Sequence, residues 1–174
     1  MVNKIKIFKN IYPLLRFIFG LFLFWIVLFV VQQIVFLLFI YRALYNIPFG
    51  EALAGFCYAQ RLNVSAACYL ILPPFIITVI GIIVRKSGSG FIIARIFTSV
   101  MIIVVLLVGL FDLGLYSNWG TKINSKALSF LVYPKEIMEM IFDAANLFYF
   151  GMFIILSIGV IWLFKRLIKI PDKI

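Results

Sequence analysis

The amino-acid sequence predicts an all-α, polytopic integral membrane protein with four transmembrane helices and one or two amphipathic interfacial helices on the outer side. Four long apolar runs predict this fold class, at about residues 17–40, 64–84, 91–115 and 147–164. Hydrophobic residues make up 66% of the chain and charged residues 13%, against roughly half and about a quarter in soluble domains. Most of the charge lies in the short segments between the runs, so residues 1–174 form a single transmembrane domain.

The first run, 17–40, is longer than the roughly 20 residues that one crossing needs. Basic residues precede it, as in a signal peptide, but its apolar stretch exceeds the roughly 7–15 residues of such a signal. We therefore expect an uncleaved membrane anchor. Gln32 and Gln33 lie in its outer half, where hydrogen bonds between helices explain them more simply than transport does.

The second run, 64–84, contains Pro73 and Pro74, which remove backbone donors and should kink or interrupt the helix. Arg85 and Lys86 end this run. The Ser-Gly-Ser-Gly sequence at 87–90 then predicts a short flexible turn.

The third run, 91–115, holds Arg95 in its first turns, where a long side chain can reach back to the membrane surface. Ala94 and Thr98 are four residues apart, the spacing at which small residues let two helices approach closely. The fourth run, 147–164, is closed by basic residues that begin at Lys165.

The basic residues predict the orientation. Four crossings place the N-terminus, the 85–90 turn and the C-terminus on one side, and that side carries eleven of the 16 Lys and Arg. Because cytoplasmic flanks of membrane helices are enriched in Lys and Arg, both termini are expected in the cytoplasm. The net charge of +10 therefore indicates contact with membrane lipids and their anionic headgroups, with no role in nucleic-acid binding.

Two outer segments, about 41–63 and 116–146, are too long for tight turns. The first is modestly amphipathic, and a short interfacial helix fits it. In the second, a helix beginning near Pro134 would carry one stripe of acidic residues: Glu136, Glu139 and Asp143. A solvated polar face is the default interpretation of this stripe, and a divalent cation touching two carboxylates is the alternative.

Few residues in the chain could carry chemistry. The sequence has no histidine, the commonest general base and metal ligand. It also lacks a phosphate-binding GxxxxGK[ST] loop, an HExxH pair, zinc-ligand spacing and a GxSxG elbow. We therefore assign no catalytic residue, no metal ligand and no cofactor to this chain, and leave open whether it belongs to an enzyme. An Asn63-Val64-Ser65 sequon lies on the predicted outer side.

Asp112, near the outer end of the third run, is expected to pair with Arg61, Lys122 or an indole N–H, and a proton or coupling-ion site is the alternative. Cations beside interfacial aromatic residues suit an anionic lipid headgroup, and ordinary anchoring is the simpler interpretation. The candidate residues for headgroup or outer-motif contacts are Arg61, Asp112, Tyr116, Trp119, Gly120 and Lys122.

The outer end of the third run carries a D-x-x-x-Y-x-x-W-G pattern, formed by Asp112, Tyr116, Trp119 and Gly120, and a P-K-E stretch follows at 134–136. This resembles the membrane region of lipoteichoic-acid-synthase-like proteins, in the Bacteroidetes-type sulfatase branch of the alkaline phosphatase superfamily. The segment 56–74 is similar to that family's G-x-R-x-D-x-S-x-x-x-Y-L-x-x-P segment. It departs at Ala59, where the family usually has Gly, and at Asn63, where it usually has Asp.

The resemblance covers only the membrane half of that family. It implies the membrane-anchor domain of a cell-envelope sulfatase or phosphoglycerol-transferase-like enzyme, truncated before an extracellular catalytic domain that would bind a divalent metal. It also implies a bacterial inner membrane. The alternative is a stand-alone four-span protein, such as a small transporter or an assembly subunit, and the oligomeric state stays open.

Overall fold

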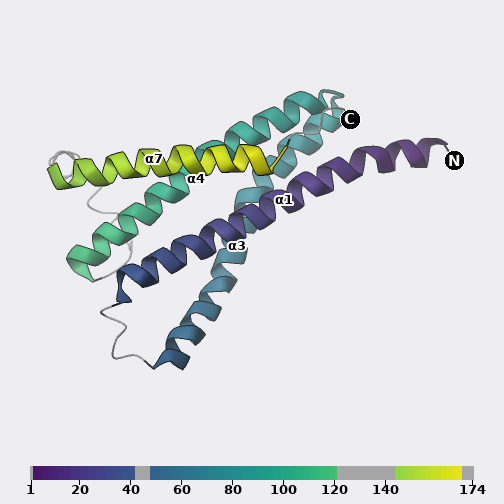
Figure 1. The fold of residues 1–174 in the computed structure, drawn as a ribbon. Helices are drawn as coiled ribbons and strands as arrows, with labels where there is room; N and C mark the ends of the chain where they lie inside the picture. Colours follow the sequence, from purple (N-terminus) through teal and green to yellow (C-terminus); the bar gives the residue numbers. More distant parts are fainter. Residues whose placement is uncertain (1, 42–47, 121–143, 170–174) are drawn as a thin grey trace. The chain divides into compact units, whose positions relative to one another are not determined.

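The computed structural model describes residues 2–41, 48–120 and 144–169. Its helices, drawn in Figure 1, are α1 (Val2–Phe39), α3 (Phe49–Ile83), α4 (Ser87–Trp119) and α7 (Ala144–Leu167). Within those described ranges there is no strand. The prediction of an all-α fold is therefore confirmed.

Each helix contains a segment that is long and apolar enough to cross a membrane. These segments are Tyr12–Phe39, Phe49–Ile83, Ser87–Tyr116 and Phe150–Leu167. At about 1.5 Å per residue, even the shortest segment approaches the ~30 Å of a hydrocarbon core, and α3 exceeds it. The chain is thus a multi-pass membrane protein by the length and composition of its helices.

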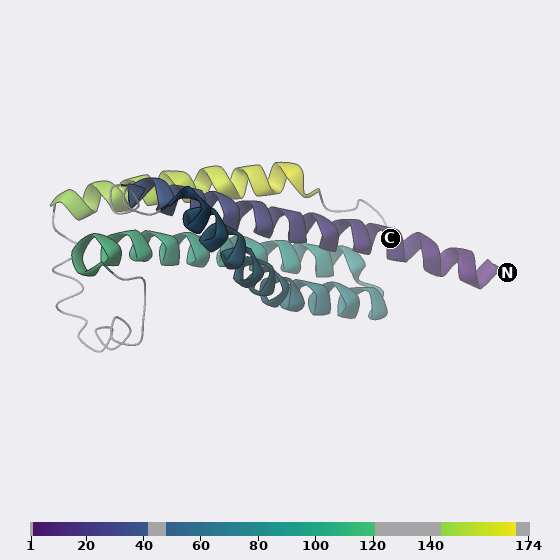
Figure 2. The same cartoon turned by 90° about the horizontal axis from the view of Figure 1, so that it is seen from below.

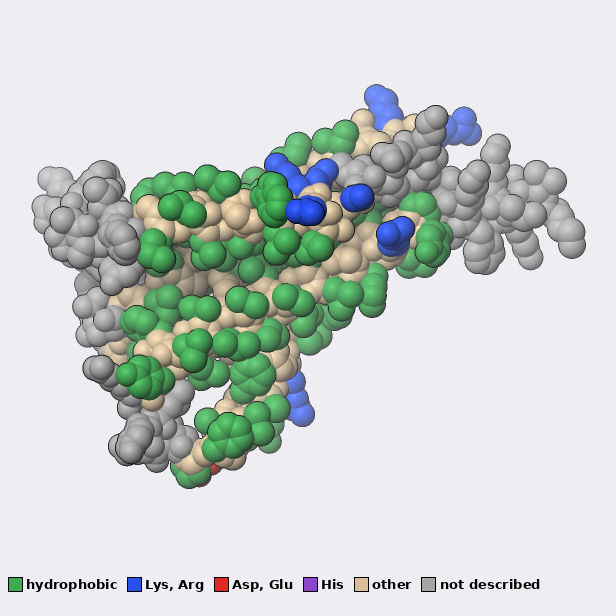
Figure 3. Space-filling view, viewed as in Figure 1, with side chains coloured by type: hydrophobic (Ala, Val, Ile, Leu, Met, Phe, Trp, Pro, Cys, Tyr) green, Lys and Arg blue, Asp and Glu red, His purple; other side chains and the backbone are tan. Residues whose placement is uncertain are grey.

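On the face shown in Figure 3, hydrophobic side chains cover most of the described surface of the helices. Large hydrophobic side chains such as Phe19, Tyr69 and Ile155 are 63%, 78% and 73% exposed. Soluble proteins rarely expose contiguous apolar patches beyond a few hundred Å². Lipid is the solvent that makes such surfaces stable, which agrees with the membrane assignment.

The chain divides into two compact units, one formed by Met1–Met101 with Phe164–Ile174 and the other by Ile102–Leu163. Helices α4 and α7 each pass from one unit into the other. The first unit therefore contains α1, α3, the N-terminal half of α4 and the end of α7. The second contains the rest of α4 and most of α7.

The core of the first unit is built on one face of α1. Phe17, Leu21 and Trp25 follow one another at four-residue steps, and all three are buried. The ring of Phe17 meets that of Phe91 edge-on, with 5.1 Å between centroids. Phe24 approaches Phe164 at the same centroid distance, so aromatic contacts join α1 to the start of α4 and to the end of α7.

The second unit buries one stripe on each of its helices. Ile102 and Leu106, four residues apart, are the buried positions on α4, and Phe153 and Ser157 are those on α7. The ring of Phe150 lies 6.0 Å from that of Phe153, between centroids. The four-residue spacing is the helical period, so each stripe is one face of its helix.

Helix α3 begins at Phe49, much earlier than the expected start of the second span near residue 64. Pro48 is its N-cap residue, and the Pro48 carbonyl accepts hydrogen bonds from the N–H groups of Glu51 and Ala52, at 3.0 and 3.2 Å. No proline interrupts the chain from there to Pro73. Residues 49–63, expected in a separate interfacial helix, are instead the N-terminal part of α3.

The proline pair bends α3 without ending it. The helix is continuous through Pro73 and Pro74, and Figure 2 shows it changing direction partway along its length. The hydroxyl of Thr78 donates to the carbonyl oxygens of Pro74 and Phe75, at 2.8 and 2.9 Å. Such back-bonding uses carbonyls of the bent turn and is itself associated with helix bending.

The turn between α3 and α4 is shorter than expected. Only Val84, Arg85 and Lys86 lie outside the two helices, and Ser87 already begins α4, so the predicted flexible turn at 87–90 is wrong. The Lys86 N–H donates to the Gly81 carbonyl at 2.8 Å, and the Arg85 N–H donates to the Ile82 carbonyl at 3.1 Å. This is a Schellman ending, with Arg85 in the left-handed region at φ 57°.

Glycines at 81 and 90 have a packing role that the sequence interpretation missed. A Cβ atom added to Gly81 would lie 2.9 Å from the Cα of Gly90, and one added to Gly90 would lie 3.1 Å from the Cα of Gly81. The two backbones therefore touch each other on either side of the turn. Gly90 permits this contact, which explains a glycine inside the first turns of α4.

The predicted amphipathic helix after Pro134 lies outside the described residues. Of the segment 116–146, only its two ends are described, as the end of α4 and the start of α7. Its acidic stripe and the possible cation contact therefore stay predictions.

Candidate functional site

A cluster of side-chain amides joins α1 to α3 in the first unit. Gln33 on α1 places its Oε1 atom 2.8 Å from Nε2 of Gln60 and 3.1 Å from Nδ2 of Asn63, and both groups donate to it. Asn63 Nδ2 also donates to Gln60 Oε1 at 3.1 Å. The expectation that Gln33 bonds between helices is confirmed.

The cluster extends to the backbone of α3. The amide nitrogens of Gln33 and Gln60 both donate to the Phe56 carbonyl, at 3.4 and 3.2 Å. All three amide side chains are half-buried. An amide neither gains nor loses a proton near neutral pH, so this arrangement cannot serve as a general acid or base. It can hold two helices together, at roughly 0.6–2 kcal/mol per bond in membranes.

Gln60 and Asn63 were missed by sequence reasoning. They lie three residues apart and therefore share one face of a helix. The sequence interpretation placed them at the membrane surface, where a polar side chain needs no protein partner. The signal that could have found them is a Gln at the matching depth of the preceding span, since α1 and α3 share the most extensive contact among the described helices.

The sequon residue Asn63 is held in this cluster. It lies inside α3, and its side-chain nitrogen already donates to Gln33 and Gln60. A glycan would attach to that same nitrogen. The described conformation therefore does not present Asn63 as an acceptor.

The predicted outer-motif residues fall in different parts of the chain. Arg61 is exposed on α3, and its guanidinium carbon lies 5.6 Å from the centroid of the Tyr58 ring, a cation–π contact one turn away. Asp112 and Tyr116 are half-buried on α4 in the second unit. Lys122 lies outside the described residues, so the predicted pairing of Asp112 stays a prediction.

Trp119 and Gly120 mark the end of α4. Trp119 is the last helical residue. Gly120 follows with φ 66°, and its N–H donates to the Tyr116 carbonyl at 3.0 Å. A left-handed glycine is the usual stop for a helix, which gives this part of the motif a structural role whatever else it does.

Arg95 binds the end of another helix. Its Nη2 atom donates to the carbonyl of Lys165 at 2.8 Å, and its Nε–H is buried without an acceptor among the described residues. Lys165 lies in the last turn of α7, where carbonyl groups have no partners in the helix. The guanidinium of Arg95 therefore caps α7, and the expectation that this side chain reaches back to the membrane surface stays a prediction.

Thr98 and Ala94 are both buried, at 1% and 0% exposed, so the small pair on α4 does lie in a packed position. The Thr98 hydroxyl donates to the Ala94 carbonyl at 2.8 Å within the helix. Cys57 and Cys68 are free and exposed, and Cys68 lines the groove described next.

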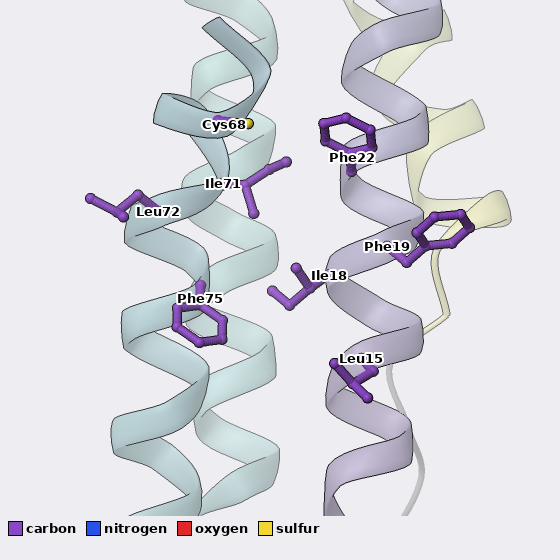
Figure 4. Close-up of a pocket in the computed structure, with 8 residues that line it drawn as sticks. All are labelled: Leu15, Ile18, Phe19, Phe22, Cys68, Ile71, Leu72 and Phe75. Carbon is purple, nitrogen blue, oxygen red and sulfur yellow. The ribbon is translucent and has the colours of Figure 1, made fainter. Parts of the chain in front are cut away.

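An open apolar groove runs between α1 and α3, with a volume of about 420 Å³ (Figure 4). Four residues of each helix line it, and none is charged: Leu15, Ile18, Phe19, Phe22, Cys68, Ile71, Leu72 and Phe75. Ile18 and Ile71 point across it toward the opposite helix in Figure 4. A groove of this composition can hold a hydrocarbon chain but offers no group for acid–base or metal chemistry.

Comparison of the chain with protein-family models, with curated proteins and with solved structures finds no match.

Proposed function

We propose that this chain anchors and positions a cell-envelope enzyme in the membrane, as the membrane domain of a sulfatase or phosphoglycerol-transferase-like protein. The observation that carries the anchoring part is the use of its intramembrane polar groups. Gln33, Gln60 and Asn63 bond one another across two helices, and Arg95 bonds the backbone of α7. Polar groups that already bond one helix to another are more typical of a structural membrane domain than of a translocation path.

The enzyme class rests on the outer motif alone. Asp112, Tyr116, Trp119 and Gly120 fill the family pattern, and α4 ends within it, between Trp119 and Gly120. A motif at a helix end lies where the chain would leave the hydrocarbon. That position suits contact with a catalytic domain, which would carry the metal and the nucleophile.

The proposed location is a bacterial inner membrane with both termini in the cytoplasm. The eleven basic residues on the flanks of one side support this orientation. Membrane lipids with anionic headgroups are the partners that such flanks favour.

The test is to reconstitute the chain in liposomes and to measure ester hydrolysis and solute flux in parallel. We expect no turnover of aryl sulfate or of phosphatidylglycerol, because the sequence motifs assign no catalytic group to this chain. Genomic sequence downstream of codon 174 should encode a further span and a metal-binding domain. Hydrolysis by the chain itself would contradict the proposal, as would an unrelated downstream gene together with saturable flux that Gln33→Leu abolishes.

A further inference from the structure

Arg95 is a half-buried cation whose charge the described residues do not neutralise. Its Nη2 atom donates to the Lys165 carbonyl, a neutral acceptor, at 2.8 Å. Its Nε–H is buried and has no acceptor among the described residues. A guanidinium has five N–H donors, so most of them are left for another partner. The bond to the Lys165 carbonyl lies at the exposed end of the side chain, where a ligand can reach the guanidinium.

The described part of the first unit holds one acidic side chain. This is Glu51, in the first turn of α3 and therefore at the opposite end of that helix from the turn into α4. Helices α1 and α7 contain no Asp or Glu, and neither does α4 up to Met101. An ionised group within a membrane protein ordinarily has a partner of opposite charge. The described residues do not provide one for Arg95.

The end of α7 adds further positive charge around Arg95. Lys165 and Lys169 lie four residues apart there, and both are exposed. Helical carbonyls point toward the C-terminal end of their helix, so the bond to the Lys165 carbonyl brings the guanidinium toward Lys169. Figure 3 shows Lys and Arg side chains gathered over the end of α7. We call Arg95, Lys165 and Lys169 the α7 basic site.

Apolar side chains border the α7 basic site. Ile92 and Ile96 lie on either side of Arg95 in the sequence of α4, and both are exposed. Leu163 and Leu167 lie on either side of Lys165 in α7, and they are exposed as well. In a helix that crosses a membrane, such side chains face lipid. A ligand at this site therefore meets hydrocarbon as well as positive charge, and a phospholipid has a part that suits each.

We propose that the α7 basic site binds the phosphate group of one anionic phospholipid, with Arg95 and Lys169 as its main contacts. The planar guanidinium presents paired N–H donors that match phosphate oxygens. The lysines add attraction for a headgroup with a net negative charge. The proposal gives Arg95 a role beyond capping α7, and it does not depend on the enzyme class proposed above.

Charge complementarity decides which lipid binds. The choline group of a zwitterionic lipid would bring a positive charge next to Lys165 and Lys169, which cancels much of the gain from its phosphate. A second copy of this chain would bring the same basic residues to the contact, and like charges repel. A lipid with a net negative charge meets neither cost.

Native mass spectrometry of the full chain, in detergent at low salt, tests this proposal. The probes are dioleoyl phosphatidylglycerol and dioleoyl phosphatidylcholine, which have the same acyl chains, at matched concentrations. We expect one phosphatidylglycerol to stay bound under conditions that remove phosphatidylcholine. Inorganic phosphate should not displace it, because the acyl chains supply part of the affinity.

A pair of double variants tests the position of the site. Lys165→Gln with Lys169→Gln removes two exposed charges and keeps Arg95 in place, and it should weaken phosphatidylglycerol binding roughly 30-fold. The control, Arg85→Gln with Lys86→Gln, removes two exposed charges from the α3–α4 turn and should leave binding unchanged.

Nuclear magnetic resonance of the chain with ¹⁵N-labelled arginine tests the role of Arg95 directly. The Nε signal of Arg95 is the one that Arg95→Lys removes. Phosphatidylglycerol should shift this signal and phosphatidylcholine should not, because only the first brings an anionic partner to the guanidinium. Asp172, the acid nearest the end of α7 in the sequence, lies outside the described residues. Asp172→Asn should leave the signal unchanged when no lipid is present.

Four outcomes would overturn the proposal. Equal retention of the two lipids would show that the headgroup charge is not recognised. An equal loss in the two double variants would show a general attraction to the basic side of the protein. Displacement by inorganic phosphate would show a site for a free anion. A shift of the Arg95 signal in lipid-free Asp172→Asn would show that the chain supplies its own negative partner.

Discussion

The two helix contacts of α3 are made in opposite ways. Against α1, it uses long polar side chains, with Gln60 and Asn63 donating to Gln33. Against α4, it packs backbone against backbone, because Gly81 and Gly90 have no side chains to keep the two helices apart. In lipid there is no hydrophobic gain from pressing two apolar helices together, so polar bonds and close backbone packing are the remaining ways to join them. One helix shows both.

The difference teaches that the two contacts should respond differently to substitution. A contact between two glycines leaves no space for another atom, because an added Cβ atom would meet backbone atoms that cannot move aside. An amide contact can lose one member and let its partners find another acceptor. Substitutions should therefore lower the free energy of unfolding more at the glycines than at the amides.

The largest effect is expected for Gly81→Ala. The new Cβ atom would lie 2.9 Å from the Cα of Gly90, so the turn must open, at a cost of about 3 kcal/mol in the free energy of unfolding. Gly55→Ala is the matched control on the same helix, because no atom lies within 4 Å of its Cβ position and alanine favours a helix. Unfolding by sodium dodecyl sulfate, followed by circular dichroism, measures both. Equal stability of the two variants would show that the glycines do not touch.

A smaller loss is expected for Gln33→Leu, which removes the acceptor shared by Gln60 and Asn63. We expect about 1.5 kcal/mol, since each intramembrane hydrogen bond contributes roughly 0.6–2 kcal/mol. In a double-mutant cycle with Asn63→Leu, the losses should be non-additive. The control cycle pairs Gln33→Leu with Ser65→Ala, whose losses should add. Additivity in both cycles would argue against the amide cluster.

Arg85→Gly should instead stabilise the α3–α4 turn. Arg85 occupies the left-handed region at φ 57°, which costs a side-chain-bearing residue about 1 kcal/mol relative to glycine. Lys86→Gly, on the next residue, relieves no such strain and should give no gain. The same unfolding titration compares them, and a destabilised Arg85→Gly protein would show that the charge of Arg85 matters more than its backbone.

The sequence predicted the spans well because an apolar run long enough to cross a bilayer is a direct physical signal. It also indicated that Gln33 bonds between helices, since a Gln in hydrocarbon needs a partner. It failed on the start of the second span. Residues 49–63 contain Glu51, Gln60 and Arg61 and were therefore expected in a separate interfacial helix, yet they are the N-terminal part of α3.

Two other contacts could not be predicted from the sequence and were found only in the structure. The Ser-Gly-Ser-Gly sequence at 87–90 suggested a flexible turn, but the turn bonds of Arg85 and Lys86 bring Gly90 into contact with Gly81. The contact between the two ends of the sequence was likewise hidden. The packing of Gly20 against Ile168 and of Phe24 against Phe164 brings α1 and the end of α7 together.

The central claim is that the helices cross a membrane and return, with α3 and α4 as successive crossings. Fusions of alkaline phosphatase and of green fluorescent protein after Lys86 and after Gly120 test it most directly. The account predicts fluorescence without phosphatase activity after Lys86, and phosphatase activity without fluorescence after Gly120. The same reporter active at both positions would contradict it, because α4 would then fail to cross.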